Sequence, residues 1–189
     1  MPFLSIITVN LNNSRGLKKT IESVVMQTSD DFEYIIIDGG STDDSVSVIK
    51  DNAGRISYWV SEKDNGNYNA MNKGIQMAKG EYCLFLNSGD CLFNNAVLKK
   101  VLDMGIQEDI CYGELIFNFE NGISQLATLP SKLTLDFLYY GNIWHPAAFI
   151  KKNLFDKTGL YNETYKISAD YDFFFHAIIV QECSCKYLN

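Results

Sequence analysis

The stretch EYCLFLNSGD, residues 81–90, joins a continuous apolar run to a small polar turn. Its first six residues are typical of a strand that is buried on both faces, as the strands of parallel sheets are. The chain then turns through Asn87, Ser88 and Gly89 and ends on the carboxylate of Asp90. This arrangement raises the question of what a single acid does at the tip of a buried strand.

Three similar apolar runs precede this strand, and each is followed by a segment with helical spacing of apolar residues. The runs cover residues 3–9, 32–38 and 56–60. Ser14 is expected to cap the first helix and Ser41 to open the second, because serine commonly caps helix N-termini. Four alternations of strand and helix predict βαβ units and a mostly parallel sheet.

Beyond residue 105 the order of elements changes. We expect a hairpin, a short helix, a strand and a longer helix, over residues 110–128, 133–140, 144–150 and 170–181. The hairpin is predicted to turn around Glu120–Gly122, where a glycine follows two polar residues.

Length and composition set limits on the function. The chain has 189 residues, of which 47% are hydrophobic and 21% charged, which predicts one globular domain. Its net charge of −7 argues against non-specific nucleic-acid binding and indicates that a phosphate ligand needs the help of a cation. No apolar run is long enough to span a bilayer, and the five scattered cysteines are typical of reduced thiols, so a cytoplasmic protein is expected.

Carboxylates follow the strand ends, where open α/β sheets bind their ligands. Three of the four ends pair an acid with a nearby glycine, and the acids are Asp38, Asp64 and Asp90. Asp–Gly pairs are also ordinary turn chemistry, but three on one edge favour a ligand site. Such a rim suits Mg²⁺ or Mn²⁺, which bind one or two carboxylates plus substrate phosphates.

Five segments together resemble family 2 glycosyltransferases with the GT-A fold, most closely the bacterial exopolysaccharide and colanic-acid type. In order they are SIITVNLNN, YIIIDGGSTDDS, SEKDNGNYNAMNKGI, FLNSGD and SADYDFFFH. The resemblance implies an α/β, Rossmann-like GT-A sandwich with a mostly parallel central sheet and helices on both faces. It implies one domain over 1–189, with a nucleotide-sugar-binding half over 1–105 and an acceptor-binding half over 106–189.

The resemblance also implies residue roles. A nucleoside-diphosphate sugar would pass its sugar to an acceptor hydroxyl with inversion. Asp170 matches the general base, Asp90 the acid that binds Mn²⁺ or Mg²⁺, and His145 a histidine on the acceptor or metal side. The positions that match nucleotide-sugar contacts are Thr8, Asn10, Asp38, Asp64, Asn87 and Ser88.

The chain departs from the family pattern in two ways. Asn87 and Gly89 stand where the family commonly has acids, which predicts weaker metal affinity. Family members usually continue well past the helix that carries Asp170, so the chain is expected to be truncated at its C-terminus.

We therefore expect a metal-dependent inverting hexosyltransferase of surface polysaccharide synthesis, with a UDP-sugar donor favoured over a GDP-sugar. Its acceptor would be a saccharide or lipid-linked oligosaccharide, and its membrane association at most peripheral, at the inner face. Two alternatives stay open. A sugar nucleotidyltransferase would need a glycine-rich basic loop, which Leu11–Arg15 lacks. An inactive or truncated sugar-nucleotide-binding module would explain Asn87 and Gly89.

Overall fold

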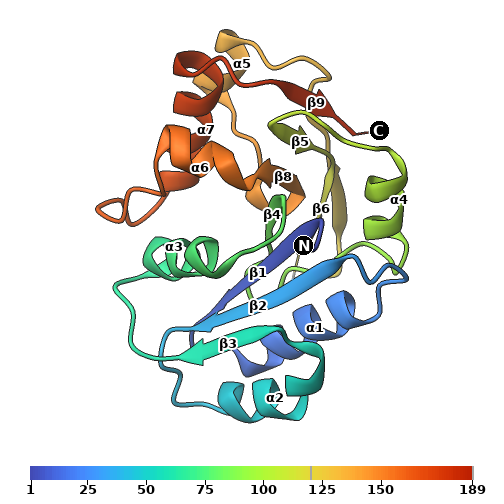
Figure 1. The fold of residues 1–189 in the computed structure, drawn as a ribbon, viewed down its shortest axis with the longest axis vertical. Helices are drawn as coiled ribbons and strands as arrows, with labels where there is room; N and C mark the ends of the chain where they lie inside the picture. The colour runs from blue at the N-terminus through green and yellow to red at the C-terminus, as the bar shows by residue number, and fades with distance from the viewer. Residues whose placement is uncertain (120, 189) are drawn as a thin grey trace.

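A computed structural model describes residues 1–119 and 121–188 of the chain (Figure 1). A seven-stranded sheet in the order β3-β2-β1-β4-β8-β5-β9 forms its centre. The four strands predicted in the first half are β1 (Leu4–Asn10), β2 (Phe32–Asp38), β3 (Tyr58–Ser61) and β4 (Tyr82–Phe85). They pair in parallel, which confirms the predicted α/β architecture.

Helices cover both faces of this sheet. Successive residues of β1 alternate between two cores, so Ile6 packs in one core with Leu17 and Ile7 in the other with Met71. The first core contains residues of α1 (Ser14–Val25), α2 (Ser45–Asp51) and α4 (Val97–Asp103). The second contains residues of α3 (Asn67–Met77), α6 (Lys152–Thr158) and α7 (Ala169–Phe175).

The second half of the chain completes the same sheet. β8 (Ala148–Lys151) lies antiparallel between β4 and β5 (Ile110–Tyr112), and β9 (Cys185–Tyr187) runs parallel to β5. Because β4 and β8 run in opposite directions, residues just after β4 lie beside residues just before β8. This pairing brings the two halves of the chain together in the middle of the sheet, where the carboxyl end of β4 meets the start of β8 (Figure 1).

The predicted hairpin is correct only in its later part. β6 (Leu115–Asn118) and β7 (Ser124–Ala127) form a separate two-stranded sheet. The prediction was wrong for residues 110–112, which join the main sheet as β5 because Ile110 and Cys111 are buried against β8. Glu120, at the predicted turn, lies outside the described residues.

The other predicted elements of this half are present with shifted bounds. The short helix is α5 (Leu135–Tyr140), and the strand expected over 144–150 opens with the 3₁₀ turn η2 (His145–Ala147) before β8. The last helix divides into α7 and a π-helical segment, η3 (His176–Val180). A further 3₁₀ turn, η1 (Ala53–Arg55), precedes β3.

The predicted helix starts needed correction. The side chain of Asn13, not Ser14, caps α1 by accepting a hydrogen bond from the N–H of Gly16 at 3.0 Å. Ser41 does not open α2, which begins at Ser45; its hydroxyl donates to Asp38 at 2.6 Å instead. The helix α1 thus starts one residue after its actual cap, and Ser41 serves the end of β2.

Candidate functional site

A row of polar side chains crosses the ends of β1, β2 and β3. The parallel register sets Asn10 beside Asp38, and Asp38 beside Ser61. Asn10 Nδ2 donates to Asp38 Oδ1 at 2.7 Å, and Ser61 Oγ donates to Asp38 Oδ2 at 2.6 Å. The N–H and hydroxyl of Ser41 complete the set at 2.9 and 2.6 Å. Register places Asn10, Asp38 and Ser61 side by side, and the loop after β2 adds Ser41. We call these four residues, Asn10, Asp38, Ser41 and Ser61, the strand-end row.

Protein donors hold both oxygens of Asp38. Burial would raise the pKa of Asp38, but hydrogen bonds from Ser41, Ser61 and Asn10 outweigh it and lower the pKa below its ordinary value. Asp38 is fully buried, so it supports the row from beneath. By contrast, Oδ1 of Asn10 is buried and accepts no hydrogen bond among the described residues. Asn10 is thus the member of the row with acceptor capacity left for a ligand.

Thr8 lies too deep for its predicted role. Its side chain is fully buried, and its hydroxyl is 3.0 Å from that of Tyr34. A ligand cannot reach this hydroxyl without opening the core. The prediction that Thr8 contacts the nucleoside is therefore corrected: its apolar neighbours in β1 carry it into the sheet, one pleat before the strand end.

Asp64 reaches the same edge from the loop after β3. Its Oδ1 accepts a hydrogen bond from the N–H of Gly66 at 2.9 Å. A Cβ atom on Gly39 would lie 2.5 Å from Oδ2 of Asp64, so only glycine lets the carboxylate settle there. The glycine after β2 thus fixes where Asp64 sits.

The turn after β4 folds around Asp90. Its Oδ2 accepts from the N–H of Asn87 at 2.9 Å, and its own N–H donates back to the carbonyl of Asn87 at 2.9 Å. Gly89 has φ of 114°, a conformation that favours glycine. Burial raises the pKa of Asp90, and the N–H of Asn87 and the nearby His145 oppose this rise. We call Asn87–Asp90 the β4 turn.

Polar side chains of α1 and of the residues that flank it hold the β4 turn and the chain that follows it. Asn13 Nδ2 donates to the carbonyl of Ser88 at 2.9 Å, and the N–H of Gly89 donates to Thr20 Oγ1 at 2.9 Å. Further along, Ser23 and Gln27 bond the backbone at Leu92, Asn94 and Leu98. The sequence analysis missed this role. Its signal was a set of polar residues at helical spacing, Thr20 and Ser23 within α1 and Gln27 just beyond its end.

Asp170 enters from the other half of the chain. It lies in the first turn of α7, directly after Ser168 and Ala169, and Ser168 has a left-handed backbone with φ of 68°. Tyr68 donates its hydroxyl to Asp170 Oδ1 at 3.1 Å, and His145 Nδ1 lies 2.9 Å from Oδ2. Burial would raise the pKa of Asp170, but the bonds from His145 and Tyr68 outweigh it and lower the pKa.

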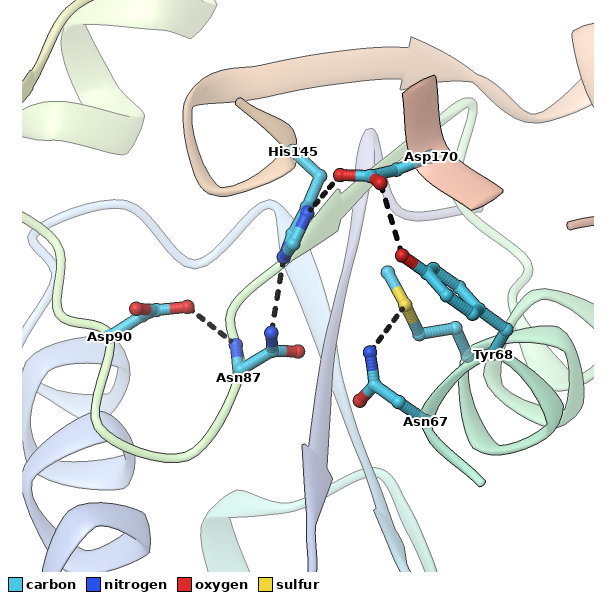
Figure 2. A network of polar contacts seen from close by, with 7 residues as sticks. Asn67, Tyr68, Asn87, Asp90, His145 and Asp170 are labelled. Atoms are coloured by element: carbon cyan, nitrogen blue, oxygen red, sulfur yellow. Dashed lines mark hydrogen bonds and ion pairs between the residues drawn. The ribbon is translucent and has the colours of Figure 1, made fainter. Parts of the chain in front are cut away.

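These contacts join into one line, which Figure 2 shows. His145 Nε2 lies 3.2 Å from Asn87 Nδ2, so the imidazole spans from the β4 turn to Asp170. The line runs Asp90, Asn87, His145, Asp170 and Tyr68, and we call it the polar line. Of the predicted site residues it unites Asn87, Asp90, His145 and Asp170. The strand-end row, with Asn10 and Asp38, and Asp64 beside it, form a second group.

Two further contacts were not predicted. Tyr68 was not among the predicted site residues, yet its hydroxyl supports Asp170. Asn69 and Asn72 each donate to Glu163 at 2.8 Å, which ties α3 to the segment before α7. Both contacts join residues far apart in the sequence, so no local sequence pattern predicts them.

The donor set of the β4 turn fits a divalent cation that also binds a substrate. Among residues 1–119 and 121–188, no group of three or more His, Cys, Asp and Glu is arranged to hold a metal ion by itself. The turn offers the carboxylate of Asp90 and Oδ1 of Asn87, which is buried and accepts no hydrogen bond in the described structure. Hard oxygen donors in this small number suit Mg²⁺ or Mn²⁺ when phosphates supply the remaining ligands.

Comparisons with known proteins agree with this geometry. Residues 5–164 match the family Glycosyl transferase family 2. A PGL/p-HBAD biosynthesis glycosyltransferase of Mycobacterium bovis (strain BCG / Pasteur 1173P2) is 35% identical over 182 residues, which cover 91% of this chain and 68% of the relative.

Solved structures share the fold at lower identity. TarS 1–349 of S. aureus in complex with UDP-GlcNAc superposes with a TM-score of 0.80 at 18% identity, over the whole of this chain and 56% of that one. The mannosyltransferase PcManGT from Pyrobaculum calidifontis in complex with GDP-Man and Mn²⁺ gives 0.75 at 14% identity, covering 99% of this chain and 55% of that one. This chain thus spans little more than half the length of these two structures.

Within the described part of the chain, no helix has both the length and the apolar character needed to cross a membrane. The family match extends from β1 through most of the segment before α7, and so includes the strand-end row and the β4 turn. The chain belongs to glycosyl transferase family 2.

Proposed function

We propose that the protein transfers a sugar from a nucleoside diphosphate to an acceptor hydroxyl, with inversion and with Asp170 as the general base. The observation that carries this proposal is the polar line. It brings one carboxylate from the acceptor half, Asp170, into contact through His145 with the turn that carries Asp90. A single base on one side and a cation site on the other suit a one-step displacement.

The nucleotide would lie along the strand-end row and beside Asp64. Asn10 Oδ1 is the acceptor there that has no partner among the described residues, and Asn87 and Ser88 of the β4 turn would lie toward the diphosphate. When bound to Asp90 and Asn87, Mn²⁺ or Mg²⁺ would stabilise the charge that develops on the leaving diphosphate. The small residues Ser88 and Gly89 would leave room for the diphosphate. The single acid at the tip of β4, Asp90, would thus hold the cation beside it.

Asp170 would accept the proton of the acceptor hydroxyl. Its side chain is 12% exposed, so the carboxyl group is not fully sealed from solvent. A lowered pKa keeps the carboxylate ionised at neutral pH and thus able to accept. Tyr68 and His145 fix its plane while it does so.

The structural neighbours support a nucleotide sugar as the donor substrate, and their ligands include both a UDP-sugar and a GDP-sugar. TarS is described with UDP-GlcNAc and PcManGT with GDP-Man and Mn²⁺. We favour a UDP-sugar donor and a saccharide or lipid-linked acceptor in surface polysaccharide synthesis at the inner face of the membrane. The exopolysaccharide or colanic-acid subgroup belongs to the same proposal.

A thermal-shift titration with UDP, GDP, ADP and dTDP, each with and without Mn²⁺, tests the donor site first. A nucleotide at 100 times its Kd stabilises the folded state by about 2.7 kcal/mol. We expect one nucleotide to give a shift that needs Mn²⁺. Hydrolysis of the matching nucleotide sugar then separates an enzyme from a binding module, which holds nucleotide without releasing sugar. No shift with any nucleotide would contradict the proposal.

A further inference from the structure

His145 connects the two halves of the site. It lies in η2, directly before β8, and the antiparallel pairing of β8 with β4 delivers it beside the β4 turn. Its two ring nitrogens are engaged on opposite sides, Nδ1 with Asp170 Oδ2 at 2.9 Å and Nε2 with Asn87 Nδ2 at 3.2 Å (Figure 2). We propose that His145 is a positioning residue that couples the orientation of Asp170 to the β4 turn. The inference rests on the proposed function.

The two partners determine the tautomer of His145. An ionised carboxylate only accepts hydrogen bonds, so Nδ1 must carry the proton that points to Asp170. The amide nitrogen of Asn87 only donates, so Nε2 must be the acceptor. These two partners favour the tautomer that carries its proton on Nδ1. In this state each nitrogen has a matching partner, and the histidine transmits a change at one side to the other.

The carboxylate of Asp170 depends on this contact for its orientation. Tyr68 holds Oδ1 from α3, while His145 holds Oδ2 from η2. With His145 gone, one bond of 3.1 Å remains, and the carboxylate can turn about it. Because proton transfer needs the base aligned with the acceptor hydroxyl, a loosened carboxylate slows the reaction without weakening donor binding.

Asn87 makes the coupling sensitive to the donor. Its Nδ2 serves His145, while its Oδ1 is buried and accepts no hydrogen bond among the described residues. A donor complex that binds Oδ1 of Asn87 shifts the same planar amide group whose Nδ2 contacts Nε2 of His145. Binding of the donor then changes the contact between Asn87 and His145 and, through His145, the orientation of the Asp170 carboxylate on the acceptor side.

The chain offers a clean spectroscopic test because it contains only two histidines, His145 and His176. Protein labelled with [¹⁵N]histidine would show the tautomer of each in long-range ¹H–¹⁵N spectra. We expect the Nδ1–H form for His145 in the free protein. On addition of Mg²⁺ and UDP, the Nε2 signal of His145 should shift, and that of His176, which serves as internal control, should not. In Asn87→Ala the response of His145 should disappear.

Two conservative variants separate the two contacts in kinetics. The amide of Asn reaches as far as Nδ1 of His, and the amide of Gln as far as Nε2. His145→Asn can therefore keep the bond to Asp170, whereas His145→Gln keeps only the one to Asn87. For hydrolysis or transfer from UDP-GlcNAc, we expect kcat to fall about 10–100-fold in His145→Gln with KM unchanged, and less than about tenfold in His145→Asn.

The outcomes distinguish this inference from the proposed function. An Nε2–H tautomer in the free protein overturns the inference, whatever the protein catalyses. So does a shift of the backbone amides of the β4 turn with Mg²⁺ and UDP while His145 stays unmoved, or equal kinetics in the Gln and Asn variants. Failure of the wild type to bind UDP or any other nucleotide contradicts the proposed function instead, and the tautomer still decides on the positioning role.

Discussion

The strand-end row and the polar line use similar residues in opposite ways. In the row, Asp38 receives four hydrogen bonds from three neighbouring residues, so no single partner decides its position. In the line, each residue has one contact on either side, and His145 is the connection between Asn87 and Asp170. The strand-end row thus holds the Asp38 carboxylate rigidly, whereas the polar line aligns Asp170 through single contacts. A substitution in the line should therefore affect turnover, and one in the row should affect stability.

The largest effect is expected from Asp170→Asn. The variant removes the proton acceptor and presents the Nδ1–H of His145 with an amide. We expect transfer to fall roughly 10²–10⁴-fold, in the range of general base catalysis, with nucleotide binding retained. Steady-state kinetics checks this. Asp172→Asn is the matched control because Asp172 is exposed on the same helix; an equal loss there would contradict a specific role for Asp170.

Asp90→Ala should weaken nucleotide binding by roughly 10–100-fold, which corresponds to a charge-assisted contact of about 1.5–3 kcal/mol. The loss should appear only with Mn²⁺ present, because Asp90 acts on the nucleotide through the cation. Calorimetric titration with UDP, with and without Mn²⁺, measures it. If the Kd rises equally without Mn²⁺, Asp90 supports the turn and does not hold the cation.

Asp38→Ala should lower the free energy of unfolding by about 1–3 kcal/mol, because it leaves the buried donor of Asn10 and the half-buried donors of Ser41 and Ser61 without their acceptor. Urea denaturation measures the change. Asp44→Ala is a suitable control, since Asp44 is exposed and its side chain makes no capping bond to α2. A loss of nucleotide affinity with unchanged stability would assign Asp38 to ligand binding instead.

The same residue predicts a pH dependence. The pKa of Asp38 is lower in the folded protein than in the unfolded chain, where it is about 3.9. Its contribution is therefore fully present above about pH 5 and lost as the pH falls through the folded pKa. The difference in unfolding free energy between wild type and Asp38→Asn should shrink as the pH falls from about 6 to about 3. A constant difference over this range contradicts the assignment.

The smallest effect is expected from Gly39→Ala. The new methyl group would displace the Asp64 carboxylate, which is the mobile end of its side chain, so unfolding should change by no more than about 0.5 kcal/mol. Affinity for UDP should fall a few-fold if Asp64 contacts the nucleotide. Comparison with Asp64→Ala checks this: the two variants should weaken binding to a similar degree, and unchanged affinity in both would remove Asp64 from the site.

The sequence predicted the first region well because its signals are local. Four apolar runs and the glycines after them locate β1 to β4, and parallel register then places Asn10, Asp38 and Ser61 side by side. Thr8 was misplaced because both faces of β1 are covered, and sequence does not show how deep a polar residue of such a strand lies. The second region depends on the insertion of β8 beside β4, a long-range pairing with no local signal. Asp170 and His145 were found by resemblance, but their contact was not.

The place of β8 within the sheet has a consequence for how the molecule is made. During synthesis β4 emerges early, and its outer edge stays unpaired until β8 has followed it from the ribosome. Open strand edges invite pairing with other chains, and contacts between distant segments form slowly. The step that closes this edge is also the step that carries His145 to the β4 turn. A chain interrupted before His145 therefore lacks both the strand that closes this edge and the polar line.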